Sequence, residues 1–159
     1  ERLLAQGQVL ELPADAKDPW DLPGVIDDAD CELTGSWKKS ANFKPHIGSG
    51  YLHDNNLGDG QSQAVFRYNA SESGEFELYM AYSAHETRAR KVPVVVTSGS
   101  FEEKITVDQT QPIPKSKLFR LIGKVQLEAG IETLIKVTNY ETNGFVIVDA
   151  IRLIATNKS

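Results

Sequence analysis

The chain has 159 residues, of which 40% are hydrophobic and 25% are charged, and its formal net charge is −5. This length suits one domain, and the acidic balance, spread along the chain, argues against nucleic acid or an anionic membrane as a partner, because both favour a basic face. The sequence holds no apolar run as long as a membrane span, and its lone cysteine, Cys31, excludes an internal disulfide.

Residues 1–23 are predicted to be the end of a preceding domain followed by a linker. Residues 1–12, ERLLAQGQVLEL, have the pattern of a short helical or extended arm, and residues 13–24, PADAKDPWDLPG, are rich in residues that break periodicity. The chain opens on Glu1 without a signal-peptide pattern, so we expect it to be part of a longer or processed protein. The predicted module spans residues 24–159.

From Val25 onward the pattern predicts one strand after another. In residues 74–84, Phe76, Leu78, Met80 and Tyr82 alternate with their neighbours, which is typical of a strand with one buried face. Gly99-Ser100 predicts a hairpin turn between strands 92–98 and 101–109. The other predicted strands are 24–30, 63–70, 117–130, 131–141 and 144–155.

The last predicted strand, 144–155, is apolar on both faces, which predicts a central strand covered on both sides. No segment after the linker carries a helical period of useful length. Short strands with regular turn signals and a central C-terminal strand indicate an all-β fold, a jelly-roll β-sandwich in which the first and last strands are neighbours.

Several segments, taken in order, resemble a known family. They are IDDADCELTGSW (26–37), GSGYLHDNNLGDGQSQAVF (48–66), SGEFELYMAYSAHETRARKVPVVV (73–96), ITVDQ (105–109) and NGFVIVDAIRL (143–153). Together they are similar to the golvesin C-terminal-like or xanthan-lyase-type carbohydrate-binding domain. The resemblance implies a galactose-binding-like β-sandwich, a carbohydrate ligand, no catalysis in this domain, and an extracellular or periplasmic location.

The segment RLLAQGQVLEL (2–12) is similar to one that joins such domains to bacterial FAD-dependent oxidoreductase domains. No G-x-G-x-x-G follows a predicted strand, so FAD would bind only in a preceding domain, and we expect no cofactor here beyond a structural calcium. The stretch TRARKVP (87–93) departs from the family at Thr87, Arg90 and Lys91. If this loop contacts a ligand, we expect its preference to differ from that of other family members and to favour an acidic sugar.

The stretch GSGYLHDNN (48–56) supplies three candidate ligand-binding residues, Tyr51, His53 and Asp54. Zinc and an acid/base pair are disfavoured, because converging ligands and a nucleophile motif are lacking. Two interpretations stay open. His53 anchors its loop through a backbone carbonyl and Asp54 caps the Asn55-Asn56 turn, or these groups bond sugar hydroxyls.

Three more residues complete the predicted ligand site: Trp37, Arg88 and Asn143. Trp37 is either a flat face for a sugar or a core residue. Arg88 lies in a polar loop between two strong strands and carries a donor fork suited to carboxylates or vicinal hydroxyls. Asn143 either reaches a ligand or serves its turn.

Asp28, Asp30 and Asp149 form a candidate calcium site. Neighbouring first and last strands would bring these carboxylates together, and calcium prefers oxygen ligands. Asp149 interrupts an apolar strand, so if it does not bind calcium it needs another partner, such as a backbone turn or Arg152.

The leading hypothesis is a non-catalytic carbohydrate-binding module of a larger exported bacterial enzyme, either an FAD-dependent oxidoreductase or a polysaccharide-degrading protein. One alternative is a structural domain that packs on the preceding catalytic domain without a ligand. A second alternative is a polysaccharide lyase or hydrolase, for which the sequence identifies no pair of carboxylates.

Overall fold

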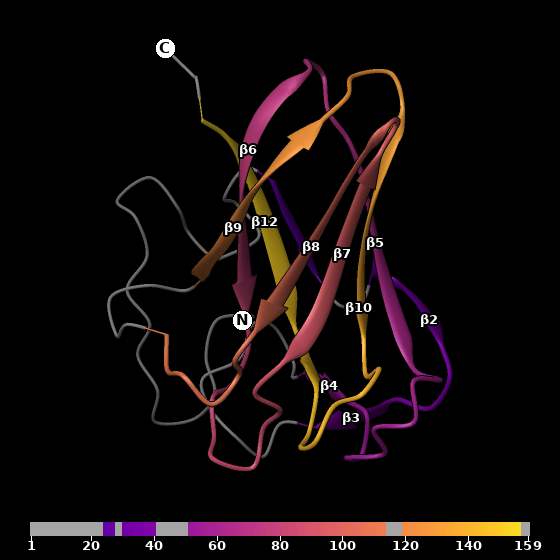
Figure 1. The fold of residues 1–159 in the computed structure, drawn as a ribbon, viewed down its shortest axis with the longest axis vertical. Coiled ribbons are helices and arrows are strands. Elements are labelled where there is room, and N and C mark those ends of the chain that lie inside the picture. Colours follow the sequence, from indigo (N-terminus) through magenta and orange to yellow (C-terminus); the bar gives the residue numbers. More distant parts are fainter. Residues whose placement is uncertain (1–23, 28–29, 41–50, 114–118, 157–159) are drawn as a thin grey trace.

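The computed structural model describes residues 24–27, 30–40, 51–113 and 119–156 (Figure 1). These residues form strands arranged in three sheets, and the described part of the chain contains no α-helix. The predicted all-β jelly-roll sandwich is confirmed. The predicted arm and linker, 1–23, lie outside the described residues, and no described segment is a helix long and apolar enough to cross a membrane.

The larger layer of the sandwich is a five-stranded antiparallel sheet with the order β2-β5-β10-β7-β8. Strands β7 and β8 form the predicted hairpin, since Ser98 pairs with Phe101 across Gly99, whose φ is 58°. The strands of this sheet are β2 (Glu32–Thr34), β5 (Gln63–Asn69), β10 (Glu132–Thr138), β7 (Val92–Ser98) and β8 (Phe101–Val107).

The second layer is a four-stranded sheet with the order β1-β12-β6-β9. Val25 pairs with Arg152, so the predicted neighbourhood of the first and last strands is confirmed. Strand β12 lies between β1 and β6, which confirms its predicted central position. The strands are β1 (Val25–Asp27), β12 (Ala150–Ala155), β6 (Gly74–Ala81) and β9 (Arg120–Leu127).

A small third sheet, β11-β4-β3, lies at one end of the sandwich, seen at the bottom of Figure 1. Its strands are β11 (Ile147–Val148), β4 (Tyr51–His53) and β3 (Lys38–Ser40). The predicted single strand 144–155 is wrong in this respect: the chain breaks at Asp149, so that β11 joins the end sheet and β12 joins the four-stranded sheet.

The core lies between the two larger sheets and follows the predicted alternation. Phe76, Leu78, Met80 and Tyr82 are at most 6% exposed. Burial of each such side chain is worth about 1.5–3 kcal/mol, which fixes the inward face of β6. The rigid sandwich in turn positions the loops at the end that carries β3 and β4.

Candidate functional site

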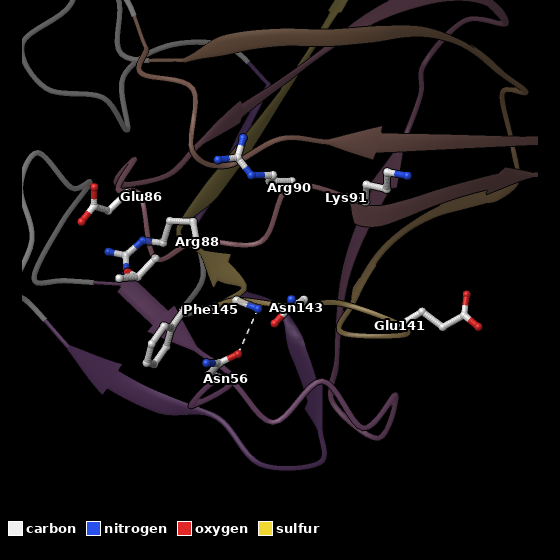
Figure 2. Close-up of a pocket in the computed structure, with 10 residues that line it drawn as sticks. Asn56, Glu86, Arg88, Arg90, Lys91, Glu141, Asn143 and Phe145 are labelled. Carbon is white, nitrogen blue, oxygen red and sulfur yellow. Dashed lines mark hydrogen bonds between the residues drawn. The ribbon is translucent and has the colours of Figure 1, made fainter.

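Two adjoining hollows at one end of the sandwich form the candidate site, here called the end hollow. Their volumes are about 540 and 400 Å³, and Thr87, Arg88 and Phe145 line both. Figure 2 shows the larger of the two. The end sheet supplies one wall, and the loop between β6 and β7 and the segment before β11 supply the others. The smaller hollow adds Lys38, Lys39, Tyr51, His53 and Asn55, and the larger adds Asn56, Glu86, Arg90, Lys91, Glu141 and Asn143.

Backbone pairing joins the two loops that carry Arg88 and Phe145. These residues form an isolated parallel bridge, in which Phe145 N–H donates to the Thr87 carbonyl at 3.0 Å and Ala89 N–H donates to the Phe145 carbonyl at 2.9 Å. At Gly144, φ is +125° and an added Cβ would lie 2.6 Å from the Arg88 carbonyl group. A glycine is therefore required for this close approach.

Arg88 places a buried positive charge in the wall of the end hollow. The residue is 4% exposed; its Nε donates to the Ser83 carbonyl at 2.9 Å and one terminal nitrogen donates to Ser83 Oγ at 3.1 Å. Its guanidinium carbon lies 5.8 Å from the centroid of the Tyr51 ring, within the range of a cation–π contact. Burial lowers the pKa of Arg88 and Tyr51 opposes this effect, and an arginine side chain stays protonated at neutral pH.

His53 and Tyr51 lie two residues apart on β4, so they share one face of the strand, and both line the smaller hollow. Tyr51 is 1% exposed. The His53 ring meets Phe145 edge-on with 5.4 Å between centroids, and its Nδ1 accepts the Asn55 backbone N–H at 3.0 Å. His53 therefore anchors its loop through an N–H, where a carbonyl was predicted. Burial lowers the pKa of His53; Asp54 opposes the shift, and the charges of Arg88 and Lys38 reinforce it.

Asp54 has a structural role. Its side chain is fully buried, and it accepts hydrogen bonds from the backbone N–H groups of Asn56 at 3.0 Å and Val146 at 2.9 Å, and from the Asn139 side-chain amide at 3.0 Å. The turn-capping interpretation of Asp54 is thus confirmed. Because the carboxylate faces inward onto these donors, we exclude Asp54 from the proposed ligand contacts.

The rim of the end hollow carries unusual backbone. Asn55, Asn56 and Glu141 have φ values of 59°, 57° and 53°, and these are all the non-glycine residues with positive φ in the described part of the chain. All three line the end hollow. Asn56 Oδ1 accepts the Gly144 N–H at 3.0 Å, drawn as a dashed line in Figure 2. Left-handed backbone outside glycine costs energy and gathers at functional sites.

The other predicted ligand residues divide between the end hollow and the core. Asn143 is exposed and lines the larger hollow. Trp37 is half-buried against the core, and its Nε1 donates to the Thr34 carbonyl at 3.0 Å and to the Gln63 carbonyl at 3.3 Å. It is not among the described residues that line the end hollow. The core interpretation of Trp37 is the one that fits this position.

The predicted calcium ligands divide likewise. Asp30 is exposed, Asp149 is 2% exposed, and Asp28 lies outside the described residues. Among the residues that the structure describes, no group of three or more His, Cys, Asp and Glu side chains could hold a metal ion. Calcium at these positions stays a prediction.

Sequence reasoning missed the contributions of Phe145, Lys38, Lys39 and Asn56 to the end hollow. Phe145 was counted as part of a continuous apolar strand, although the Asn143-Gly144 turn next to it marks a rim position. The pair Lys38-Lys39 is a local signal for a positive wall, in addition to the cations of TRARKVP (87–93).

The fold defines the chain as a jelly-roll β-sandwich module. It belongs to the golvesin C-terminal domain family, whose model matches residues 24–155. The resemblance found in the sequence is therefore confirmed.

Two relatives and one further structure show the extent of the similarity. The chain is 31% identical over 150 residues to a xanthan lyase from Bacillus sp. (strain GL1), a match that covers 90% of the chain and 16% of that protein. The structure of a Paenibacillus xanthan lyase matches with a TM-score of 0.74 and 30% identity, over 84% of this chain and 13% of that one. A family 35 carbohydrate-binding module from Clostridium thermocellum matches in fold, with a TM-score of 0.61 and 15% identity over 85% of this chain and 99% of that one.

Proposed function

We propose that the chain is a non-catalytic carbohydrate-binding module of a larger, exported bacterial enzyme, and that the end hollow is its ligand site. The observation that carries the proposal is the end hollow itself, because it sets an arginine, amide side chains and the Phe145 ring around one concave surface. Sugars present apolar C–H faces and a ring of hydroxyls, and they bind where aromatic rings and several hydrogen-bonding groups converge.

The acidic residues at the site support binding without catalysis. Glu86 and Glu141 both line the larger hollow, but their carboxylates lie on opposite sides of it and point outward (Figure 2). A glycosidase needs two carboxylates that flank one bond. The fold shared with a family 35 carbohydrate-binding module supports the same conclusion.

The proposed role is to tether a substrate. A module that holds a polysaccharide raises its effective concentration at an attached catalytic domain. That the chain spans only 16% of the xanthan lyase it matches supports a place within a longer protein. The attached domain would act on polysaccharide or be an FAD-dependent oxidoreductase, and the module would work outside the cell or in the periplasm.

The test is affinity electrophoresis of the 159-residue chain through gels that contain single polysaccharides, neutral and acidic. We expect at least one gel to retard the native chain, and Asn143→Ala to reduce that retardation. Asn69→Ala is the matched control, because Asn69 is also exposed and pairs with Glu132 at the end of β5 away from the end hollow. A natively folded chain that no polysaccharide retards would contradict the proposal and favour a purely structural module.

A further inference from the structure

We propose that the end hollow selects glycans that carry carboxylates, such as polymers with uronic acid residues. The inference rests on the proposed carbohydrate-binding function and adds the charge class of the ligand. It depends on how charge is distributed over the molecule.

Local charge at the end hollow is opposite in sign to the charge of the whole chain. The chain has 17 Lys and Arg against 22 Asp and Glu, a formal net charge of −5. The side chains that line the end hollow include more cations than anions: Lys38, Lys39, Arg88, Arg90 and Lys91 against Glu86 and Glu141. A concave surface with one sign of charge concentrates ligands of the other sign.

The cations reach the end hollow from separate parts of the fold. Lys38 and Lys39 lie on β3, where Lys38 pairs with His53 of β4. Arg88 is held in the wall between Ser83 and the Tyr51 ring. Burial is the main cause that lowers the pKa of His53; Asp54 raises it, and the charges of Arg88 and Lys38 lower it.

Elsewhere on the surface a cation is neutralised by its neighbours, whereas in the described part of the chain three lysines of the end hollow have no such neighbour. Arg67 binds Glu32 at 2.6 Å and Glu132 at 2.8 Å, on the face of the five-stranded sheet. Within the described residues, neither Lys38, Lys39 nor Lys91 has a carboxylate within 4.0 Å, and Arg90 approaches Asp108 only to 3.9 Å. Exposed cations without a local counter-charge are available to an anionic ligand.

The neighbouring side chains favour a carboxylated sugar over a simple anion. Asn143 and Asn55 are exposed at the rim, and Phe145 lies half-buried between the two hollows. Amides suit hydroxyl groups, an aromatic ring suits the C–H face of a sugar, and lysines suit a carboxylate. One residue of an acidic polysaccharide presents all three groups together.

The experiment compares xanthan, alginate and polygalacturonate, each with its own carboxyl-reduced form, in affinity gels and in titrations of the 159-residue chain. Reduction removes the charge and keeps the sugar backbone. We expect at least one acidic polysaccharide to bind at least about fivefold more tightly than its reduced form at low salt, with the difference shrinking as salt rises. Poly-L-glutamate, a carboxylated polymer without sugar, should bind less tightly than that polysaccharide.

The variant is Lys38→Gln with Lys39→Gln, and the matched control is Lys104→Gln with Lys124→Gln, which changes net charge equally at exposed positions of β8 and β9. We expect the first pair to weaken binding of the acidic polysaccharide about fivefold and the control pair to leave it within about twofold. Equal losses in both pairs, or equal binding of poly-L-glutamate, would show attraction by net charge alone and overturn the inference. Equal binding of acidic and reduced forms would overturn it while the proposed function stands, and binding of no polysaccharide would overturn both.

Discussion

The carboxylate of Asp54 accepts a hydrogen bond from the side-chain amide of Asn139 at 3.0 Å, and both side chains are fully buried. Through this contact the end of β4 is joined to the end of β10, in a different sheet. The same carboxylate holds the Val146 N–H just before β11. One side chain thus fixes three segments behind the end hollow.

We expect Asp54→Ala to lower the free energy of unfolding by roughly 2–4 kcal/mol, because it leaves the buried Val146 N–H without an acceptor and removes an acceptor from Asn56 N–H and the Asn139 amide. Urea denaturation measures this loss. Asp59→Ala is the control, since Asp59 also accepts from Asn139, at 3.1 Å, but is exposed. A loss in Asp59→Ala as large as that in Asp54→Ala would contradict the structural role given to Asp54.

The close approach of Gly144 to Arg88 gives a second prediction. Gly144→Ala places a Cβ 2.6 Å from the Arg88 carbonyl group and keeps a residue at φ +125°. We expect a loss of about 2–4 kcal/mol in the free energy of unfolding, from strain and overpacking. Gly130→Ala shares a positive φ, of +80°, but has open space around its Cβ, so thermal denaturation should show a loss nearer about 1 kcal/mol. Equal losses of unfolding free energy in Gly144→Ala and Gly130→Ala would show that backbone strain alone causes the effect and that the close approach to Arg88 does not contribute.

A third prediction concerns Gln109, whose side chain hydrogen-bonds both backbone groups of Ile147, as a paired strand would. It is fully buried, its Nε2 donates to the Ile147 carbonyl at 2.9 Å, and its Oε1 accepts the Ile147 N–H at 2.8 Å. Gln109→Leu should cost roughly 2–4 kcal/mol of unfolding free energy, because both backbone groups lose their partner.

Gln109→Glu separates these two hydrogen bonds. A protonated carboxyl can still donate to the Ile147 carbonyl, whereas the carboxylate cannot, and burial raises the pKa of such a carboxyl. The stability of this variant should therefore fall as pH rises from 5 to 8, measured by urea denaturation at each pH. A flat profile relative to the native chain would show that position 109 is solvated.

The sequence predicted the sandwich because its signals are local. Phe76, Leu78 and Met80 alternate with less buried residues along one strand, and this pattern is typical of a strand with one face in the core. The break at Asp149 was not predicted, since a single polar residue in an apolar run does not show that two sheets share the run. The break is set by the pairing of β11 with β4 and of β12 with β6, and a single sequence does not show which distant strands pair.

The end hollow could be predicted only in part for the same reason. Tyr51, His53, Arg88 and Asn143 were predicted as ligand residues and line it, and their contact with a ligand stays a prediction. Phe145 was missed because its partner is the loop at Arg88, far away in the chain. In a turn-rich stretch the sequence predicts that a polar residue such as Asp54 is exposed. Its burial depends on hydrogen-bond donors from distant segments, which the sequence does not reveal.

The last prediction concerns the charge of His53. Burial, reinforced by the charges of Arg88 and Lys38, holds the pKa of His53 below its usual value near 6.5, against the pull of Asp54. A lowered folded-state pKa means that the unfolded chain binds the proton more readily. The stability linked to His53 is therefore fully present above pH 6.5 and is lost as pH falls from there through the lowered folded-state pKa.

Titration of the His53 ring by NMR should show this lowered pKa directly. Lys38→Gln removes one of the charges that lower it, so the pKa of His53 should rise in that variant, and the loss of stability on acidification should become smaller. Lys104→Gln is the matched control, because Lys104 is exposed on β8 and does not line the end hollow. An equal rise in both variants would assign the effect to net charge. A fall in Lys38→Gln would contradict the positive potential on which selection of an acidic glycan depends.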